Sequence, residues 1–200
     1  MIIMDTITQA KPYNLVLVPD VRLNQKSVDV LEINDEIKEC MDRLLATIHA
    51  NQGIGISAVQ VGIMKRIVVI DIDGVHKKLE QDHIPGMHGG KPLYMVNPEL
   101  IEKSTELETM DEGCMSVPNV YVNVTRSAEI KVKYLDYEGK EQTLKVEKGL
   151  LSACIQHEID HTNGVIILDY LSPLKRQMQM KKVEKYKKLL QRTEEKENLS

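Results

Sequence analysis

The sequence predicts an α+β fold, with β-strands packed around a mostly buried helix and a second helix at the C-terminus. Residues 150–163 repeat apolar side chains at steps of three and four, which is the spacing of a helix. Residues 128–147 alternate apolar and polar side chains around a Glu-Gly turn, which indicates a β-hairpin. Residues 175–192 carry eight Lys or Arg and one Glu, which is typical of a charged helix. With 200 residues, 42% of them hydrophobic, the chain is expected to form one domain.

Local patterns predict the remaining elements. Asn34 is expected to cap a helix, because acidic residues follow it and apolar residues then recur at helical spacing. The core face of that helix comprises Ile37, Cys40, Met41, Leu44, Leu45 and Ile48. Short apolar or alternating runs predict strands at residues 15–18, 66–72, 93–96 and 103–110.

A segment rich in glycine and proline interrupts this series of strands. A turn signal at Asp73-Gly74 is followed by an excursion loop at residues 75–92. The loop region contains His76, His83 and His88. Their spacing fits no metal-binding motif, so they are expected at the surface.

Residues 157–161, His-Glu-Ile-Asp-His, carry the strongest chemical signal in the chain. Positions i and i+4 of a helix share one face, so His157 and His161 can offer two imidazole nitrogens to one metal ion. Glu158 lies beside them, where its carboxylate can act as a base toward water. Asp160 is interpreted as an exposed carboxylate, with a supporting role behind the ligands as the alternative. Ordinary core histidines are the alternative for the pair.

A catalytic site of this kind needs a third protein ligand, and the chain offers three cysteines. Cys40 fits the apolar face of a helix and is interpreted as a core residue. Cys154 lies seven residues from His161, about 10 Å along a helix axis, which is too far for two ligands of one ion. It is interpreted as lining a cavity beside the site. Cys114 remains, in a predicted turn at residues 111–118 where Pro118 ends any strand; a buried free thiol is its alternative.

A glycine-rich segment at residues 53–62 is the third candidate constellation. Three glycines in ten positions indicate backbone that passes close to another group. The segment lacks the Lys-Ser/Thr ending of a phosphate-binding loop and follows a helix rather than a strand. An ordinary helix stop and turn is the alternative interpretation.

Three ordered segments resemble the signature motifs of the peptide deformylases. They are Gly-Ile-Gly-Ile-Ser-Ala-Val-Gln at 53–60, Glu-Gly-Cys-Met-Ser at 112–116 and Gln-His-Glu-Ile-Asp-His at 156–161. The similarity extends over residues 15–176, most of the chain. Three positions depart from the residues seen in the family: Ser57 replaces a usual Ala, Met115 a usual Leu, and Tyr121 an Arg that some members carry near the substrate entrance.

The resemblance implies a metal-dependent hydrolase that removes the N-formyl group from the formylmethionine of newly made polypeptides, releasing formate. It implies that Cys114, His157 and His161 hold the metal and that Glu158 is the general base. It assigns stabilisation of the oxyanion to Gln60 and the backbone N–H of Met115. It implies substrate contacts from Ile54, Gly55, Met110, Leu150, Ala153 and Cys154. The implied metal is Fe(II), with Zn or Ni as substitutes.

Charge is distributed unevenly along the chain. The formal net charge is −4, but residues 175–200 hold nine basic and four acidic residues, a net of +5, which leaves −9 for the rest. We therefore divide the chain into a catalytic domain at 1–176 and a basic helical tail at 177–200. The tail is either a solvated helix or a surface that attracts RNA. The resemblance implies docking on the ribosome, as in some bacterial deformylases.

Composition also bears on location. No apolar run reaches the roughly 18 residues of a membrane span, and the first residues do not resemble a signal peptide. Three cysteines without framework spacing fit a reducing compartment. Composition therefore predicts a cytoplasmic protein with no membrane partner, and the resemblance implies a bacterial one.

Two other functions share some of these features. A zinc metallopeptidase also uses His-Glu-x-x-His, but Ile167 occupies the position of its third histidine, and Glu184, a downstream alternative, lies in a basic stretch. A non-enzymatic metal module or ribosome-binding protein would need a fourth protein ligand or a missing base. The presence of Glu158 argues against this last hypothesis.

Overall fold

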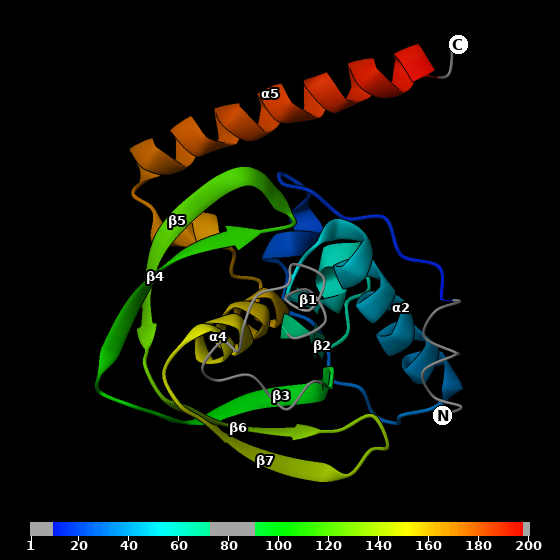
Figure 1. Ribbon diagram of the computed structural model, residues 1–200, viewed down its shortest axis with the longest axis vertical. Coiled ribbons are helices and arrows are strands. Elements are labelled where there is room, and N and C mark those ends of the chain that lie inside the picture. Colours follow the sequence, from blue (N-terminus) through cyan, green and yellow to red (C-terminus); the bar gives the residue numbers. More distant parts are fainter. Residues whose placement is uncertain (1–9, 73–90, 198–200) are drawn as a thin grey trace.

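The computed structural model describes residues 10–72 and 91–197, and it places two antiparallel sheets on either side of a central helix (Figure 1). The larger sheet has the strand order β1-β2-β3-β6-β7, and β4 pairs with β5 in the smaller one. The strands are β1 Gly55–Ser57, β2 Ile67–Ile70, β3 Leu93–Lys103, β4 Leu107–Cys114, β5 Val117–Ser127, β6 Ile130–Leu135 and β7 Glu141–Val146. The helices are α2 Asp35–Asn51, α4 Leu150–Thr162 and α5 Pro173–Glu197, with short 3-10 turns η1 Val21–Asn24, η2 Ala58–Val61 and η3 Ile167–Tyr170. The predicted fold class is confirmed.

Helix α2 forms where the sequence predicted it. The side chain of Asn34 accepts a hydrogen bond from the backbone N–H of Ile37 at 3.1 Å, which satisfies one of the free donors of the first turn. The predicted core face is buried from Cys40 to Ile48, while Ile37 is partly buried. This face packs against β1 and β2, and so supports the glycine-rich segment from behind.

Helix α4 lies at the centre of the molecule (Figure 1). All of its residues except Leu150 and Asp160 are buried. Leu151, Cys154 and Ile155 pack with apolar side chains of the larger sheet, which explains why the apolar pattern covers most of the helix surface. After the helix, Gly164 has a φ of 77°, and a Cβ there would lie 2.8 Å from the backbone of Asn24. This close approach requires glycine and fixes the end of the helix.

The β4–β5 hairpin differs from the prediction for this region. The sequence predicted one strand at 93–96, another at 103–110 and a turn at 111–118. The structure has β3 running on to Lys103, β4 running on to Cys114 and a turn of only two residues before β5. Pro118 lies inside β5 rather than ending the ladder. It falls where the register shifts between the Cys114–Val117 and Gly113–Tyr121 pairs, so the missing N–H costs no ladder bond.

The prediction of a strand at residues 15–18 is wrong. This segment is extended but joins no sheet. Val16 donates to the carbonyl of Gln60 at 2.7 Å, and Val18 donates to the carbonyl of Ser116 at 3.0 Å, so its bonds go to two separate segments. The predicted turn at 73–74 and the histidines of the excursion loop lie outside the described residues.

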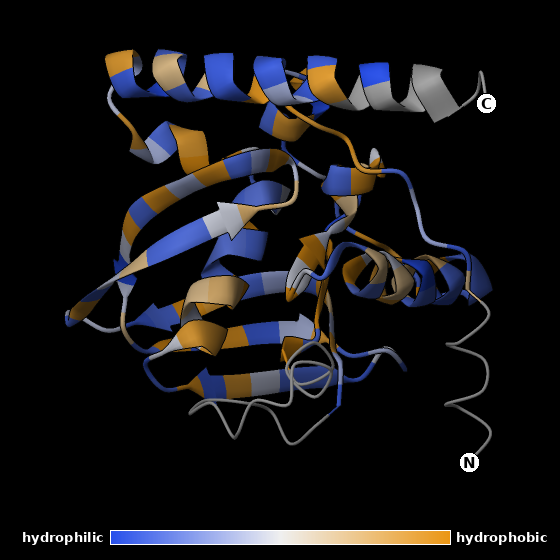
Figure 2. Cartoon of the chain, turned by 45° about the horizontal axis from the view of Figure 1, so that its top comes forward, coloured by the Kyte–Doolittle hydropathy of each residue, from blue (hydrophilic) through white to orange (hydrophobic). Residues whose placement is uncertain are grey.

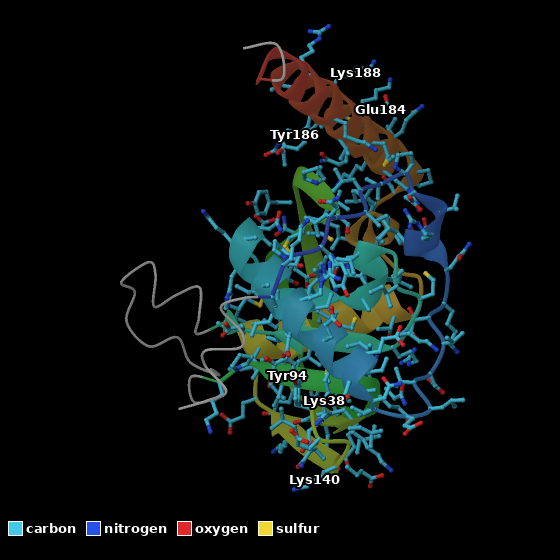
Figure 3. The ribbon with its side chains drawn as sticks, turned by 90° about the vertical axis from the view of Figure 1, so that its right-hand side faces the viewer. Lys38, Tyr94, Lys140, Glu184, Tyr186 and Lys188 are labelled. Carbon is cyan, nitrogen blue, oxygen red and sulfur yellow. The ribbon has the colours of Figure 1, made fainter. Side chains whose placement is uncertain are left out.

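Helix α5 crosses over the β4–β5 hairpin (Figure 1). Val183 is fully buried among valines of β5, and Met180 packs beside it. The outer surface of α5 is mostly hydrophilic (Figure 2), and its residues Glu184 and Lys188 point away from the body of the protein (Figure 3). Met178 and Leu189, which share a helical spacing with Val183, are exposed. No helix in the described ranges has the length and apolarity needed to cross a membrane.

Candidate metal centre and active-site cleft

Three potential metal ligands converge between the central helix and the smaller sheet. Helix α4 presents His157 and His161 one turn apart, and Cys114 is the last residue of β4. One donor atom from each lies within 4.8 Å of the others, and Cys114 Sγ is 3.2 Å from His161 Nε2. Burial lowers the pKa of His161 well below its usual range, so its ring is neutral, the form that binds metals. A thiol and two imidazoles make a donor set suited to Fe(II) or Zn.

Glu158 lies beside this cluster and is almost completely buried. Burial raises the pKa of its carboxyl to about 7, so it can both accept and return a proton near neutral pH. Oε2 of Glu158 has no hydrogen-bond partner among the described residues. Glycine at position 55 permits β1 to lie against it, because a Cβ there would be 2.9 Å from Glu158 Oε1 and 2.7 Å from Cys154 Sγ.

Gln60 is held with its amide N–H₂ group toward the cluster. Its Oε1 accepts from the backbone N–H of Ser57 at 2.8 Å, which fixes the orientation of the amide. Nε2 then donates to Ser116 Oγ at 3.3 Å and toward Cys114 Sγ at 3.6 Å. Gln60 therefore offers a fixed, uncharged donor at the site.

A buried ionic network stands behind His157. Nδ1 of His157 lies 2.9 Å from Glu112 Oε2, and Arg126 pairs with both carboxylate oxygens of Glu112. Burial alone would raise the pKa of Glu112. Hydrogen bonds from His157 and Arg126 outweigh this effect and hold the pKa below its usual range. The carboxylate therefore orients the ring and leaves Nε2 toward the cluster.

Asp160 belongs to the same network, which corrects its interpretation as an exposed carboxylate. Its Oδ2 accepts from Arg126 Nη1 at 2.8 Å and from the hydroxyl of Tyr170 at 2.6 Å. No local pattern in the sequence predicted a role for Glu112, Arg126 or Tyr170. Glu112 was in a recognised motif, but Arg126 lies 34 residues from Asp160 and gave no local signal.

A cleft of about 470 Å³ opens in front of the cluster. Its walls include Cys114, His157, Glu158 and Gln60. The structure brings to the same cleft all six residues expected to contact substrate: Ile54, Gly55, Met110, Leu150, Ala153 and Cys154. Cys154 lines the cavity, as predicted, and Cys40 is a buried core residue of α2, also as predicted.

The family model described as polypeptide deformylase matches residues 12–177. The chain belongs to the polypeptide deformylase family. It is 46% identical over 175 residues to a peptide deformylase of Rickettsia prowazekii. The aligned region covers 88% of this chain and 96% of that relative. A peptide deformylase structure from Ehrlichia chaffeensis superposes with a TM-score of 0.80 at 40% identity, covering 90% of this chain and 98% of the other. A peptide deformylase structure from Legionella pneumophila superposes with a TM-score of 0.80 at 34% identity, again covering 90% of this chain and 98% of the other.

Membership of the deformylase family makes the chain a metal-dependent hydrolase that removes the N-formyl group from nascent polypeptides. The metallopeptidase alternative is not favoured. The third potential donor beside the two histidines is the thiol of Cys114. Ile167, at the position of the peptidase's third histidine, is buried in the core, and Glu184 points away from the body (Figure 3).

Proposed function

We propose that Cys114, His157 and His161 hold one divalent ion, Fe(II), which Zn or Ni can replace. The convergence of the three donor atoms and the burial of both histidines support this ligand set. The mixed sulfur and nitrogen donors suit both Fe(II) and Zn, so the choice of iron rests on the family resemblance alone. An ion bound there supplies Lewis acidity, which lowers the pKa of water and polarises a carbonyl.

Glu158 acts as the general base in this proposal. Its carboxylate takes a proton from the attacking water and returns it to the amine that leaves when the C–N bond of the formamide breaks. The products are formate and a free amino terminus. A pKa of about 7 supports both transfers, because neither protonation state is strongly disfavoured at neutral pH.

Two uncharged donors stabilise the negative oxygen that develops on the formyl carbon. They are the side-chain amide of Gln60 and the backbone N–H of Met115, which lies in the turn directly after Cys114. Each such donor contributes about 3 kcal/mol of transition-state stabilisation when it is held in place beforehand. The hydrogen bond from Ser57 to Gln60 supports such an arrangement.

The cleft binds the formylmethionine and the start of the following chain. Ile54 and Gly55 hydrogen-bond to the substrate backbone, since both belong to the segment that passes close to Glu158. The methionine side chain lies among Ile54, Met110, Leu150, Ala153 and Cys154. Their largely apolar surfaces suit a thioether side chain.

Helix α5 docks on the ribosome in the bacterial cytoplasm. Its outward-facing cations support this, because a basic helix on an otherwise acidic chain is attracted to RNA. The division into a catalytic part at 1–176 and a tail at 177–200 is supported by the family match, which ends at residue 177. Helix α5 itself begins earlier, at Pro173.

The observation that carries the proposal is the buried Glu158 beside three converging metal donors in one cleft. The test combines a metal count with turnover of formyl-Met-Ala-Ser and of unformylated Met-Ala-Ser. We expect one ion per chain, and formate released from the formylated peptide alone. Cleavage of a peptide bond in either substrate would favour a metallopeptidase, and a metal-loaded but inactive chain would favour a structural metal module.

A further inference from the structure

A second groove of about 430 Å³ lies beside the active-site cleft, between β5 of the smaller sheet and the start of α5. Its floor is β5, and its walls are the end of η3 and the first turns of α5. Tyr121 lines both this groove and the cleft, so the two cavities adjoin at this residue. The Tyr121 side chain is 68% exposed and has no role in the chemistry proposed above.

The groove combines exposed apolar surface with positive charge. Tyr170 and Met178 line it and are 44% and 58% exposed. The only charged residues in its lining are Lys175 and Lys182. Neither lysine has an ion-pair partner within residues 10–72 and 91–197.

The two carboxylates that belong to η3 or contact it are already paired. Asp160 is bonded to Arg126 and Tyr170, and Asp169 is paired with Arg176. Two uncompensated cations therefore stand over an apolar floor, an arrangement that fits a polypeptide segment with acidic side chains better than a neutral or basic one.

The distance from the metal donors to the groove matches a short length of peptide. Tyr121 is the register partner of Gly113, the residue before Cys114. The Cα of Cys114 is about 3.8 Å from that of Gly113, which is about 5.5 Å from the Cα of Tyr121 across the strand pair. The Cα atoms of Cys114 and Tyr121 therefore lie within about 9 Å of each other. An extended chain advances about 3.3 Å per residue, so the third residue of a substrate reaches Tyr121 and the next three reach the groove.

We propose that this groove binds the fourth to sixth residues of the substrate polypeptide and favours Asp and Glu at those positions. The inference rests on the proposed function, since it assumes that formylmethionine lies in the cleft. Every nascent substrate carries such a downstream segment, and the groove shares Tyr121 with the cleft that this segment leaves. RNA is the other polyanion to consider, but Lys181, Lys185 and Lys188 face outward from α5 and do not line the groove.

The experiment compares hexapeptides with the tripeptide formyl-Met-Ala-Ser, which ends at Tyr121 and does not reach the lysines of the groove. The hexapeptides add Asp-Asp-Asp, Ser-Ser-Ser or Lys-Lys-Lys to the same tripeptide. The readout is kcat/KM of each hexapeptide divided by that of the tripeptide for the same protein. In the native chain at low salt we expect the acidic hexapeptide to exceed the basic one by about 3- to 10-fold, the effect of two exposed ion pairs. The difference should shrink as salt screens the charges.

Two double variants of equal charge separate the groove from the general field of the helix. Lys175→Glu with Lys182→Glu changes the groove, whereas Lys181→Glu with Lys185→Glu changes exposed positions of the same helix outside it. We expect the first pair to reverse the preference between acidic and basic hexapeptides and the second to retain it.

Several outcomes would overturn the groove proposal. Equal ratios for the three hexapeptides in the native chain would do so, as would equal effects of the two double variants. Loss of ribosome binding by the groove variant, with its peptide ratios unchanged, would assign the groove to RNA instead. Failure of the tripeptide to be deformylated would count against the proposed function itself, which is a separate result.

Discussion

Nδ1 of His157 and Oε2 of Glu112 lie 2.9 Å apart, so one ring nitrogen of the histidine is occupied by a carboxylate that is itself held by Arg126. Partners of this kind fix the ring of a metal-binding histidine and make it a better ligand. The positioning of one proposed ligand thus depends on a residue of β4 and a residue of β5.

Glu112→Gln should weaken metal binding by about 10- to 100-fold, the usual effect of losing such a partner. Among the described residues it also leaves Arg126 with Asp160 alone as an anionic partner, so the free energy of unfolding should fall as well. Metal affinity is measured by competition with a chelator and stability by urea titration. Glu106→Gln, at an exposed site just before β4, is the matched control. Equal metal affinity in the two variants would rule out the positioning role.

Cys114→Ala should lose most of its metal, because one of the three donors that converge in the described part of the chain is removed. Cys40→Ala and Cys154→Ala should retain the ion, because neither thiol belongs to the converging set of donors and burial raises the pKa of both, that of Cys40 to about 11. Elemental analysis of the purified variants measures this directly. Metal retained by Cys114→Ala and lost by Cys154→Ala would reverse the choice of thiol.

Glu158→Ala should bind metal yet turn over formyl-Met-Ala-Ser at least about 100-fold more slowly, as expected when a general base is lost. Steady-state kinetics on samples with matched metal content provides the measurement. A metal-replete variant with full activity would refute the role of Glu158.

Glu158 should also make the stability of the metal-free protein depend on pH. In the folded state its pKa is about 7, above the ordinary value of 4.5. Its favourable contribution to the free energy of unfolding is therefore fully present below pH 4.5 and is lost as pH rises through 7. At pH 8 Glu158→Gln should therefore be more stable than the native chain by up to about 3 kcal/mol, the equivalent of the raised pKa. Urea titrations between pH 4.5 and 8 test this; a constant difference would contradict it.

The basic helix is best tested by charge reversal rather than truncation. Val183 is fully buried among the valines of β5, so deleting residues 178–200 should expose that cluster and lower the melting temperature. Changing Lys181, Lys185 and Lys188 to Glu leaves Val183 in place. We expect tripeptide turnover within a few-fold of the native value and weaker, salt-sensitive ribosome association. Ribosome binding that survives these changes would argue against docking through α5.

Local patterns predicted the elements whose hydrogen bonds are local. The cap at Asn34 and the hairpin formed by β6 and β7 depend on residues close in sequence, and both were predicted. The segment at residues 15–18 was mistaken for a strand because its two hydrogen bonds go to Gln60 and Ser116, which the sequence does not place beside it. Strand β5 was missed although Val120, Val122 and Val124 alternate, because Pro118 was taken as a stop.

The same distinction applies to the site. His157, Glu158 and His161 were predicted because one helical turn brings them together, and Cys114 was reached through spacing and family motifs. The bond between Arg126 and Asp160 joins β5 to α4, and no periodicity in the sequence connects them. The predicted substrate residues were placed by resemblance, and the cleft they share became visible only in three dimensions.

The proposed ligands also connect distant parts of the chain. Cys114 and His161 are 47 residues apart and belong to different layers, the edge of the smaller sheet and the central helix. An ion bound to both closes a loop of that length and so acts as a reversible cross-link, restricting the unfolded chain much as a disulfide does. Resistance to unfolding and to proteolysis would then follow the concentration of free metal, and chelation would lower both.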